Sequence, residues 1–224
     1  MNILAQSEPG PSIFDLITAG GLVGYAIIFL SVVAVALMVM HLVQIRHSNL
    51  MPDGVVRTLD DLLNRRDIDG ALNYCNDSNN RCFLTRVLAA GLARYRRSAF
   101  GAFELRSSLE EAGQEQAAKL YRSTDALGLI VGIAPLMGLL GTVVGMVGAF
   151  DTISSSEGFA RPDQLAGDIS QALVTTVMGL SLAIPSLAAF TYFRNRIDAL
   201  VVEVAATVEQ LTIPLESATG ENRR

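Results

Sequence analysis

Three long stretches of the chain contain no Asp, Glu, Lys or Arg, and apolar residues dominate each of them. They cover residues 16–45, 126–150 and 169–193. The two shorter stretches have 25 residues each, and a helix that crosses the hydrocarbon core of a bilayer needs about 20. The pattern therefore predicts three transmembrane helices, at 17–45, 126–150 and 169–193.

The region 46–125 has apolar residues at helical spacing on a polar background. Within it, residues 54–79 favour two short amphipathic helices, and Asp67 is placed to cap the second. Helical spacing resumes at Phe83 and continues into the second transmembrane segment, with an interruption near Gly101. We therefore expect one long helix that leaves the polar region and enters the membrane.

The third transmembrane helix is expected to continue as a polar extension over 194–213 and to end before Pro214, because proline breaks a helix interior. Residues 214–224 are polar and are predicted to form a disordered tail. The remaining parts are a short N-terminal segment, 1–16, and a connection, 151–168. Long amphipathic helices with few partners in their own chain indicate self-association.

Composition supports a membrane protein. Only 17% of the 224 residues are charged, against roughly 25% in ordinary soluble domains, and the mean hydropathy is +0.39. This excludes a secreted disulfide scaffold, a disordered chain and a simple cytosolic enzyme domain. The net charge of −5 argues against nucleic acid as a partner. Cys75 and Cys82 are too few and too widely spaced for a zinc site or a redox pair.

The distribution of basic residues predicts the orientation. Residues 1–45 contain no Lys or Arg, 46–125 contain twelve, 151–168 contain one and 194–224 contain four. The positive-inside rule places 46–125 and the C-terminus in the cytoplasm, and the N-terminus and the 151–168 connection in the periplasm. The predicted fold is an all-α membrane protein with three transmembrane helices, of which the second and third extend far into the cytoplasm.

The first transmembrane helix is bulky and aliphatic. It lacks a sustained small-residue face, so we expect it to face lipid. Its one ionisable residue is His41, and an ionisable residue inside a membrane is a functional candidate by default. However, His41 lies five residues before Arg46, which favours a position at headgroup level.

The second transmembrane helix carries a stripe of glycines at intervals of 3, 4 and 3, which favours close helix packing. Its members are Gly138, Gly141, Gly145 and Gly148. Thr142 is the only hydroxyl in 126–150. It either lines a polar surface or bonds the carbonyl of its own helix at i−4 and does nothing else.

The third transmembrane helix has a second stripe of small residues, and Pro185 is expected to kink it. The stripe comprises Ala172, Thr176, Gly179, Ala183 and Ser186, and beside it run Asp168, Gln171 and Thr175. Thr142 lies nine residues before Asp151, and Thr176 eight residues after Asp168. At a rise of about 1.5 Å per residue, both hydroxyls lie roughly 12–14 Å below the outer surface. Matched hydroxyls on small faces suit a polar conduit or a socket for another helix.

The membrane segments contain no carboxylate, Lys or Arg, and a proton relay needs a titratable group. A partner must therefore supply the acid if the chain works with protons. There is no phosphate-binding glycine loop, and two histidines near the first helix make no credible catalytic triad. We expect no enzyme activity, no metal site and no cofactor.

Two segments resemble the MotA/TolQ/ExbB proton-channel family: GIAPLMGLLGTVVGMVGAF at 132–150 and ISQALVTTVMGLSLAIP at 169–185. Three helices rather than four resemble the ExbB/TolQ branch of biopolymer transport proteins. The resemblance implies an inner-membrane complex in which five copies form a ring. It also implies an ExbD/TolR-type partner, whose helix carries the proton-binding aspartate inside that ring, and a TonB-type protein beyond it. The family's pore threonines correspond to Thr142 and Thr176.

One position departs from the family pattern. ExbB members often have a glutamate where this chain has Gln171. Either that carboxylate is dispensable here, or Asp168 substitutes for it at the outer mouth. Two functions compete: a subunit of a motor driven by the proton-motive force, and a non-conducting scaffold that only clamps a partner transmembrane helix.

Overall fold

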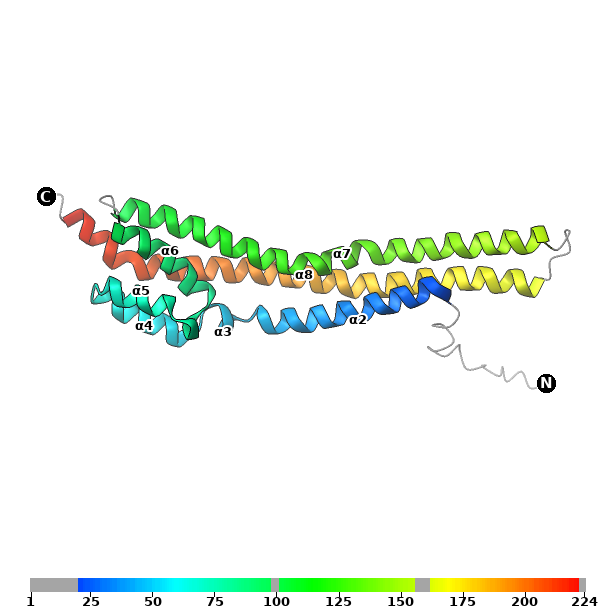
Figure 1. The fold of residues 1–224 in the computed structure, drawn as a ribbon, viewed down its shortest axis with the longest axis horizontal. Helices are drawn as coiled ribbons and strands as arrows, with labels where there is room; N and C mark the ends of the chain where they lie inside the picture. The colour runs from blue at the N-terminus through cyan, green and yellow to red at the C-terminus, as the bar shows by residue number, and fades with distance from the viewer. Residues whose placement is uncertain (1–19, 98–100, 156–161, 222–224) are drawn as a thin grey trace, which may run out of the picture. The chain divides into compact units, whose positions relative to one another are not determined.

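The computed structural model describes residues 20–97, 101–155 and 162–221, and no strand occurs in these ranges. This confirms the all-α fold class. The elements, shown in Figure 1, are α2 (Gly21–Gln44), α3 (His47–Leu50), α4 (Asp53–Asn64), α5 (Ile68–Asn76), the 3-10 turn η1 (Ser78–Asn80), α6 (Phe83–Arg97), α7 (Gly101–Ser155) and α8 (Pro162–Glu221).

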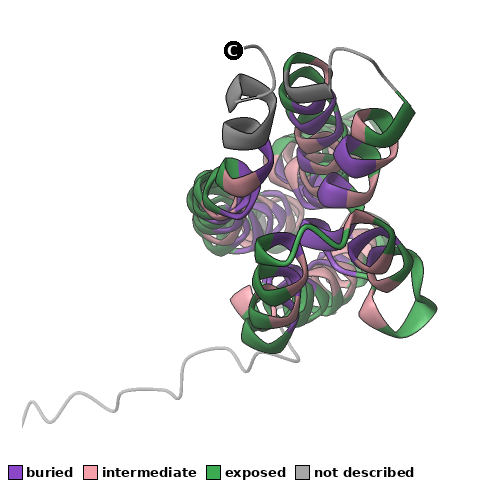
Figure 2. Cartoon of the chain, turned by 90° about the vertical axis from the view of Figure 1, so that its left-hand side faces the viewer, coloured by how far each residue is buried: buried purple, intermediate pink, exposed green. Residues whose placement is uncertain are grey.

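Three described helices are long and apolar enough to cross a membrane, as expected: α2 and the apolar parts of α7 and α8. Helices suit these sequences because a helix satisfies its own backbone hydrogen bonds where water is absent. Only 17% of the most apolar window of α2, and 28% of those of α7 and α8, is buried within the chain. Figure 2 colours the helices by burial and shows exposed residues on the outward sides of the helices nearest the viewer. Lipid or other chains must cover the rest.

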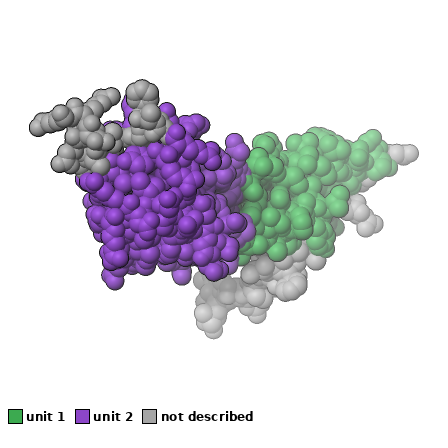
Figure 3. Space-filling view, turned by 60° about the vertical axis from the view of Figure 1, so that its left-hand side comes forward, with its two compact units in different colours: residues 1–38, 126–190 green, residues 39–125, 191–224 purple. Residues whose placement is uncertain are grey.

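The chain divides into two compact units, coloured in Figure 3. The apolar unit comprises residues 1–38 and 126–190, and the amphipathic unit comprises 39–125 and 191–224. Helices α7 and α8 pass through both. Each unit is therefore built from pieces of the chain that are far apart in the sequence, and each has its own packing.

In the apolar unit, one narrow face of α2 is buried, at Gly20, Gly24, Ile27 and Ala34. A Cβ atom at Gly20 would lie 3.4 Å from the sulfur of Met178 on α8. The helix has no sustained small-residue face, as expected from the sequence, but small residues do occupy most of this buried strip. The other sides of α2 are exposed, so facing lipid stays a prediction for them.

In the amphipathic unit, α4, α5 and α6 bury one apolar face each, for example through Leu59 on α4 and Leu88 on α6. The predicted cap of α5 is confirmed, because Asp67 Oδ1 accepts a 2.8 Å hydrogen bond from the amide of Gly70. Arg66, at the preceding turn, has a positive φ of 59°. The chain reverses here between two short helices because the cap fixes where the second begins.

The prediction of one long helix from Phe83 into the membrane is wrong. Helix α6 ends at Arg97 and α7 begins at Gly101, and the two run antiparallel. Arg94 of α6 contacts Glu111 of α7 at 3.6 Å, and a Cβ at Gly91 would touch Leu109. Folding back buries the apolar faces of α6 and α7 against each other, which one straight helix would leave in water.

Helix α8 runs on through Pro214 to Glu221. The prediction that this helix ends before Pro214 is therefore wrong, and so is the prediction of a disordered tail for the residues up to Glu221. Residues 222–224 lie outside the described part of the chain. An interior proline costs about 3 kcal/mol. Leu211 and Leu215, on either side, are 3% and 1% exposed, and burying each contributes about 1.5–3 kcal/mol. Their burial offsets the proline.

Candidate functional site

Helices α7 and α8 pack closely in the apolar unit because glycines meet backbone there. A Cβ at Gly179 would lie 2.6 Å from the carbonyl oxygen of Ala134 and 3.0 Å from Cα of Gly138. A Cβ at Gly145 would lie 2.7 Å from that of Ala172. Real Cβ atoms do not approach this closely, so these positions need glycine while the helices stay where they are.

The other predicted packing residues differ. Gly141 faces the side chain of Thr175 and is also tightly packed. At Gly148 the nearest atom that a Cβ would meet is the carboxyl carbon of Asp168, at 4.0 Å, so close packing ends before this position. Helix α8 continues through Pro185. The hydroxyl of the next residue, Ser186, is buried without a hydrogen-bond partner.

Two adjacent threonines of α8 bond the same carbonyl of α7. The hydroxyl of Thr176 donates to the Gly138 carbonyl oxygen at 3.2 Å, and that of Thr175 lies 3.5 Å from the same oxygen. Thr175 also donates to Ala172 of its own helix at 2.7 Å and is 1% exposed. Thr175 is therefore buried between the helices, whereas Thr176 is partly exposed at their edge.

Thr142 on α7 is half-buried, and its hydroxyl donates to the Leu139 carbonyl at 2.6 Å. This is a bond within its own helix, at i−3 rather than the expected i−4. Gly141 of α7 and Thr175 of α8 face each other, and Thr142 and Thr176 are the next residues along their helices. Because α7 and α8 run in opposite directions, the turn of about 100° to the next residue brings both side chains to the same side of the pair. The two threonines therefore share one face of the α7–α8 pair, the threonine face.

Helix α2 covers a different face of the pair. It meets α8 at Met178 and Gln171, whose side chains lie against Gly20 and Gly21. At about 100° per residue, Met178 lies about 160° around the axis of α8 from Thr176, and Gln171 lies about 140° from it. The threonine face is therefore left uncovered by α2. Gln171, predicted as a pore residue, points toward α2 and not onto this face.

Asp168 lies where the close contact between α7 and α8 ends, near Gly148. Its Oδ2 accepts a 3.2 Å hydrogen bond from the hydroxyl of Thr152 on α7. It is about 80° around α8 from Thr176, nearer to the threonine face than Gln171 is. Asp168 is also the one of these two residues that carries a carboxyl group, and its role at an outer mouth stays a prediction.

His41 has a packing role that the sequence interpretation did not identify, while its predicted depth at headgroup level stays a prediction. It is fully buried in the amphipathic unit, with Nε2 2.7 Å from the Ser123 carbonyl oxygen and its ring 5.5 Å from that of Phe193. The seven-residue spacing of Ile27, Ala34 and His41, all buried, is the sequence signal that pointed to this.

No group of three metal-ligating side chains comes together in the described residues. The buried polar residues of the two units are hydroxyls and one histidine. This arrangement can bind, orient and hydrogen-bond a partner group within an apolar surrounding.

The chain is similar in sequence to known proteins over most of its length. The sequence model of the MotA/TolQ/ExbB proton channel family matches residues 80–206, which contain Thr142 and Thr176. A Synechocystis protein named as an ExbB-like biopolymer transport protein, number 3, is 31% identical over 204 residues, covering 85% of this chain and 90% of that protein.

Shorter matches lie in the same branch. The biopolymer transport protein ExbB of Xanthomonas campestris is 36% identical over 95 residues, 42% of this chain and 37% of that protein. The Tol-Pal system protein TolQ of Haemophilus influenzae is 30% identical over 86 residues, 38% of this chain and 37% of that protein. The family is one of proton channels and not a family of enzymes. This chain is a membrane protein that belongs to the MotA/TolQ/ExbB proton channel family, in its ExbB/TolQ branch.

Proposed function

We propose that the chain is a ring-forming subunit of an inner-membrane motor driven by the proton-motive force. It would energise transport or envelope processes through an ExbD/TolR-type partner and, beyond it, a TonB-type protein. The observation that carries this proposal is the threonine face: two hydroxyls at one level, on a surface that α2 leaves uncovered, in segments without any charged residue.

The small buried fraction of each apolar helix supports a ring. Less than a third of each window is covered by the chain itself, so neighbouring copies would cover much of α7 and α8. A ring of five would place the threonine faces around a central space, where the partner helices pass. Lipid would then cover the outer sides of α2.

The hydroxyl geometry suggests how the face handles protons. Thr142 donates its hydrogen to Leu139 and Thr176 donates its hydrogen to Gly138. The oxygen lone pairs are therefore what both hydroxyls present to a partner. An acceptor pairs with a protonated carboxyl group, which has an O–H to donate, and not with a carboxylate. The face would bind the partner aspartate in its neutral form and release it when the proton leaves.

Charge supports the proposed orientation, with the N-terminus periplasmic and the C-terminus cytoplasmic. Arg46, Arg122, Arg194 and Arg196 flank the predicted inner ends of the spans 17–45, 126–150 and 169–193. The segments 1–16 and 151–168 carry six carboxylates and one arginine, which accounts for the whole net charge of −5. An acidic outer side would attract protons and other cations, and Asp168 would stand at the entrance.

The test uses the complex purified with its single-helix partner and placed in vesicles. Thr142→Val and Thr176→Val remove each hydroxyl and nearly keep the shape. We expect each to lower partner-dependent proton flux by at least about tenfold, corresponding to about 1.4 kcal/mol. Thr207→Val is a matched control, because the Thr207 hydroxyl also bonds its own helix, at Glu203, but lies in the amphipathic unit. Unchanged flux in both pore variants would refute the role.

The tight glycine packing supports a second candidate, a scaffold that clamps a partner helix without conducting protons. Gly138, Gly141 and Gly179 hold α7 and α8 together, and the face beside this contact would bind a partner helix equally well without proton transfer. A protonophore separates the two functions, since a scaffold keeps its activity when the proton gradient is collapsed and a motor loses it.

A further inference from the structure

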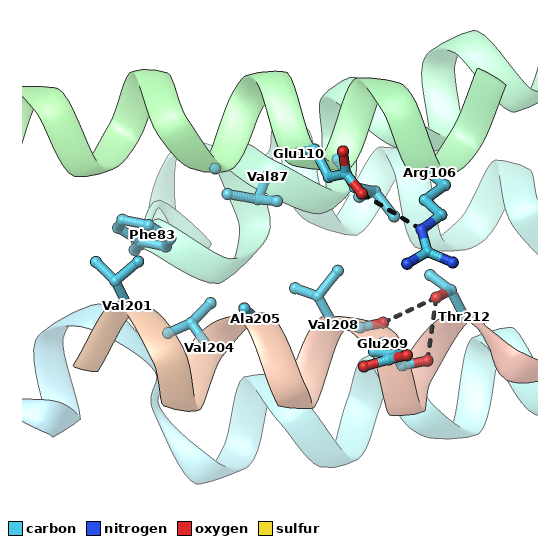
Figure 4. Close-up of a pocket in the computed structure, with 12 residues that line it drawn as sticks. Phe83, Val87, Arg106, Glu110, Val201, Val204, Ala205, Val208, Glu209 and Thr212 are labelled. Atoms are coloured by element: carbon cyan, nitrogen blue, oxygen red, sulfur yellow. Dashed lines mark hydrogen bonds and ion pairs between the residues drawn. The ribbon is translucent and has the colours of Figure 1, made fainter. Parts of the chain in front are cut away.

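An apolar groove lies in the amphipathic unit between the polar parts of α7 and α8, with α6 as its floor (Figure 4). Its volume is about 270 Å³. It runs along α8 from Val201 to Thr212, and the eleven helical steps between these residues correspond to about 16 Å. This length matches about five residues of an extended peptide.

The groove is open because small residues face it from both long helices. Gly113 of α7 and Ala205 of α8 line it, and a Cβ at Gly113 would meet no atom within 4 Å. The surrounding surface is aliphatic and aromatic, with Phe83 and Val87 coming from α6 and Val204 from α8 (Figure 4). The space suits two or three aliphatic side chains.

The two ends of the groove differ in polarity. Phe83 and Val201 stand at the apolar end, while Arg106, Glu110 and Glu209 gather at the other (Figure 4). The guanidinium Nε of Arg106 lies 3.3 Å from Glu110 Oε1, so this pair is largely neutralised. Glu209 adds a second carboxylate, and the charged end is therefore acidic on balance. An occupant that matches it carries a basic residue there.

We propose that this groove binds the cytoplasmic end of the single-helix partner, through a short segment with two or three aliphatic side chains next to a Lys or Arg. This rests on the proposed function, in which the partner threads the ring. The cytoplasmic flank of a single membrane helix is basic by the positive-inside rule, which gives it the charge that the acidic end requires. The groove would then anchor the partner near the membrane while its helix responds to protons.

Cross-linking in the intact complex tests the proposal. Ala205→Cys places a thiol in the groove, and Val202→Cys places one on the same helix at a residue that is 69% exposed and does not line it. Both are labelled with a short photo-reactive maleimide in the complex co-expressed with the partner, and the products are identified by mass spectrometry. We expect the label at 205, and not at 202, to cross-link the cytoplasmic flank of the partner.

Filling the groove gives the second measurement. Gly113→Leu projects a side chain into the open space, and Gly54→Leu on α4 is the control, because a Cβ there also meets nothing within 4 Å but lies outside the groove. We expect Gly113→Leu to lower the cross-link yield about tenfold and Gly54→Leu to leave it unchanged. Glu209→Gln should also lower the yield, more so at low salt, where charge pairing is strongest.

The outcomes separate this inference from the proposed function. A cross-link to a second copy of the chain, to lipid, or to nothing, while the partner still co-purifies and protons still flow, overturns the groove proposal alone. If no single-helix partner co-purifies and a protonophore has no effect, the proposed function fails and the groove assignment fails with it.

Discussion

The close approach of α7 and α8 predicts a large difference between two glycine-to-alanine variants. A Cβ at Gly179 would lie 2.6 Å from the Ala134 carbonyl oxygen and 3.0 Å from Cα of Gly138, whereas carbon–oxygen contacts are ordinarily about 3.3–3.6 Å. The helices must therefore separate by about 0.7–1 Å in Gly179→Ala. In Gly132→Ala the new methyl group meets no atom within 4 Å.

The size of the effect follows from this geometry. Alanine in place of a helical glycine stabilises by about 0.5–1 kcal/mol when nothing obstructs it, which is the expectation for Gly132→Ala. Overpacking costs about 1–3 kcal/mol, and a gap of 0.5–1 Å forfeits about a quarter to a half of each van der Waals contact. The 3.2 Å bond from Thr176 to Gly138 would lengthen as well. We expect Gly179→Ala to be less stable than Gly132→Ala by about 1–3 kcal/mol.

Thermal melting of the purified complex, followed by the circular dichroism of its helices, measures this difference. For chains of this size 1 kcal/mol shifts Tm by about 2–4 °C, so the two variants should differ by several degrees. Proton flux should fall in Gly179→Ala and not in Gly132→Ala, because separation of the helices displaces Thr176. Equal melting and equal flux in the two variants would refute the inferred closeness of the helices.

Three further predictions concern buried polar groups. His41→Leu removes the 2.7 Å bond to Ser123 and should cost about 1–3 kcal/mol; an unchanged Tm would contradict this. Burial, and then the charge of Cys82, raise the pKa of the Cys75 thiol to about 12. Since the folded pKa exceeds the ordinary value of 9.0, stability should be full below pH 9 and fall as the pH rises toward 12. In the folded protein, Cys75 should resist alkylation at mildly alkaline pH. If Cys75 were alkylated as fast in the folded protein as in the unfolded protein, its burial would be contradicted. Ser186 has a buried hydroxyl without a partner, so Ser186→Ala should leave stability unchanged or raise it, and a marked drop would reveal a bonded role.

The parts of the fold that could be predicted are those decided by local sequence. A run of 25 residues without charge has few alternatives to a transmembrane helix, and Asp67 caps α5 using only the next three residues. The glycines of the second span were identifiable because close packing of helices leaves this spacing. Thr142 and Thr176 were placed at one level by counting residues from the charged ends.

The parts that could not be predicted depend on contacts between distant residues. The fold-back of α6 on α7 requires that Gly91 meet Leu109, and nothing in either helix alone indicates a reversal rather than a continuation. Helix α8 passes Pro214 because Leu211 and Leu215 are buried by other elements. The depth of a residue is readable from the sequence, but its direction around the helix is not, and for this reason Gln171 was grouped with the pore threonines although it faces α2.

One residue step on α8 separates packing from the proposed proton chemistry. Thr175 is buried against Gly141, and Thr176 is turned onto the uncovered face, yet both lie within 3.5 Å of the Gly138 carbonyl. That shared carbonyl takes the hydroxyl hydrogen of Thr176 and leaves its lone pairs for a partner. Hydroxyls that donate to helix carbonyls offer their lone pairs to a protonated acid more readily than to its carboxylate, and an equilibrium moves only when its two states bind with different affinity. Under the proposed function, the chain would need no titratable group of its own on this face, because the difference in binding would reside in the partner's acid.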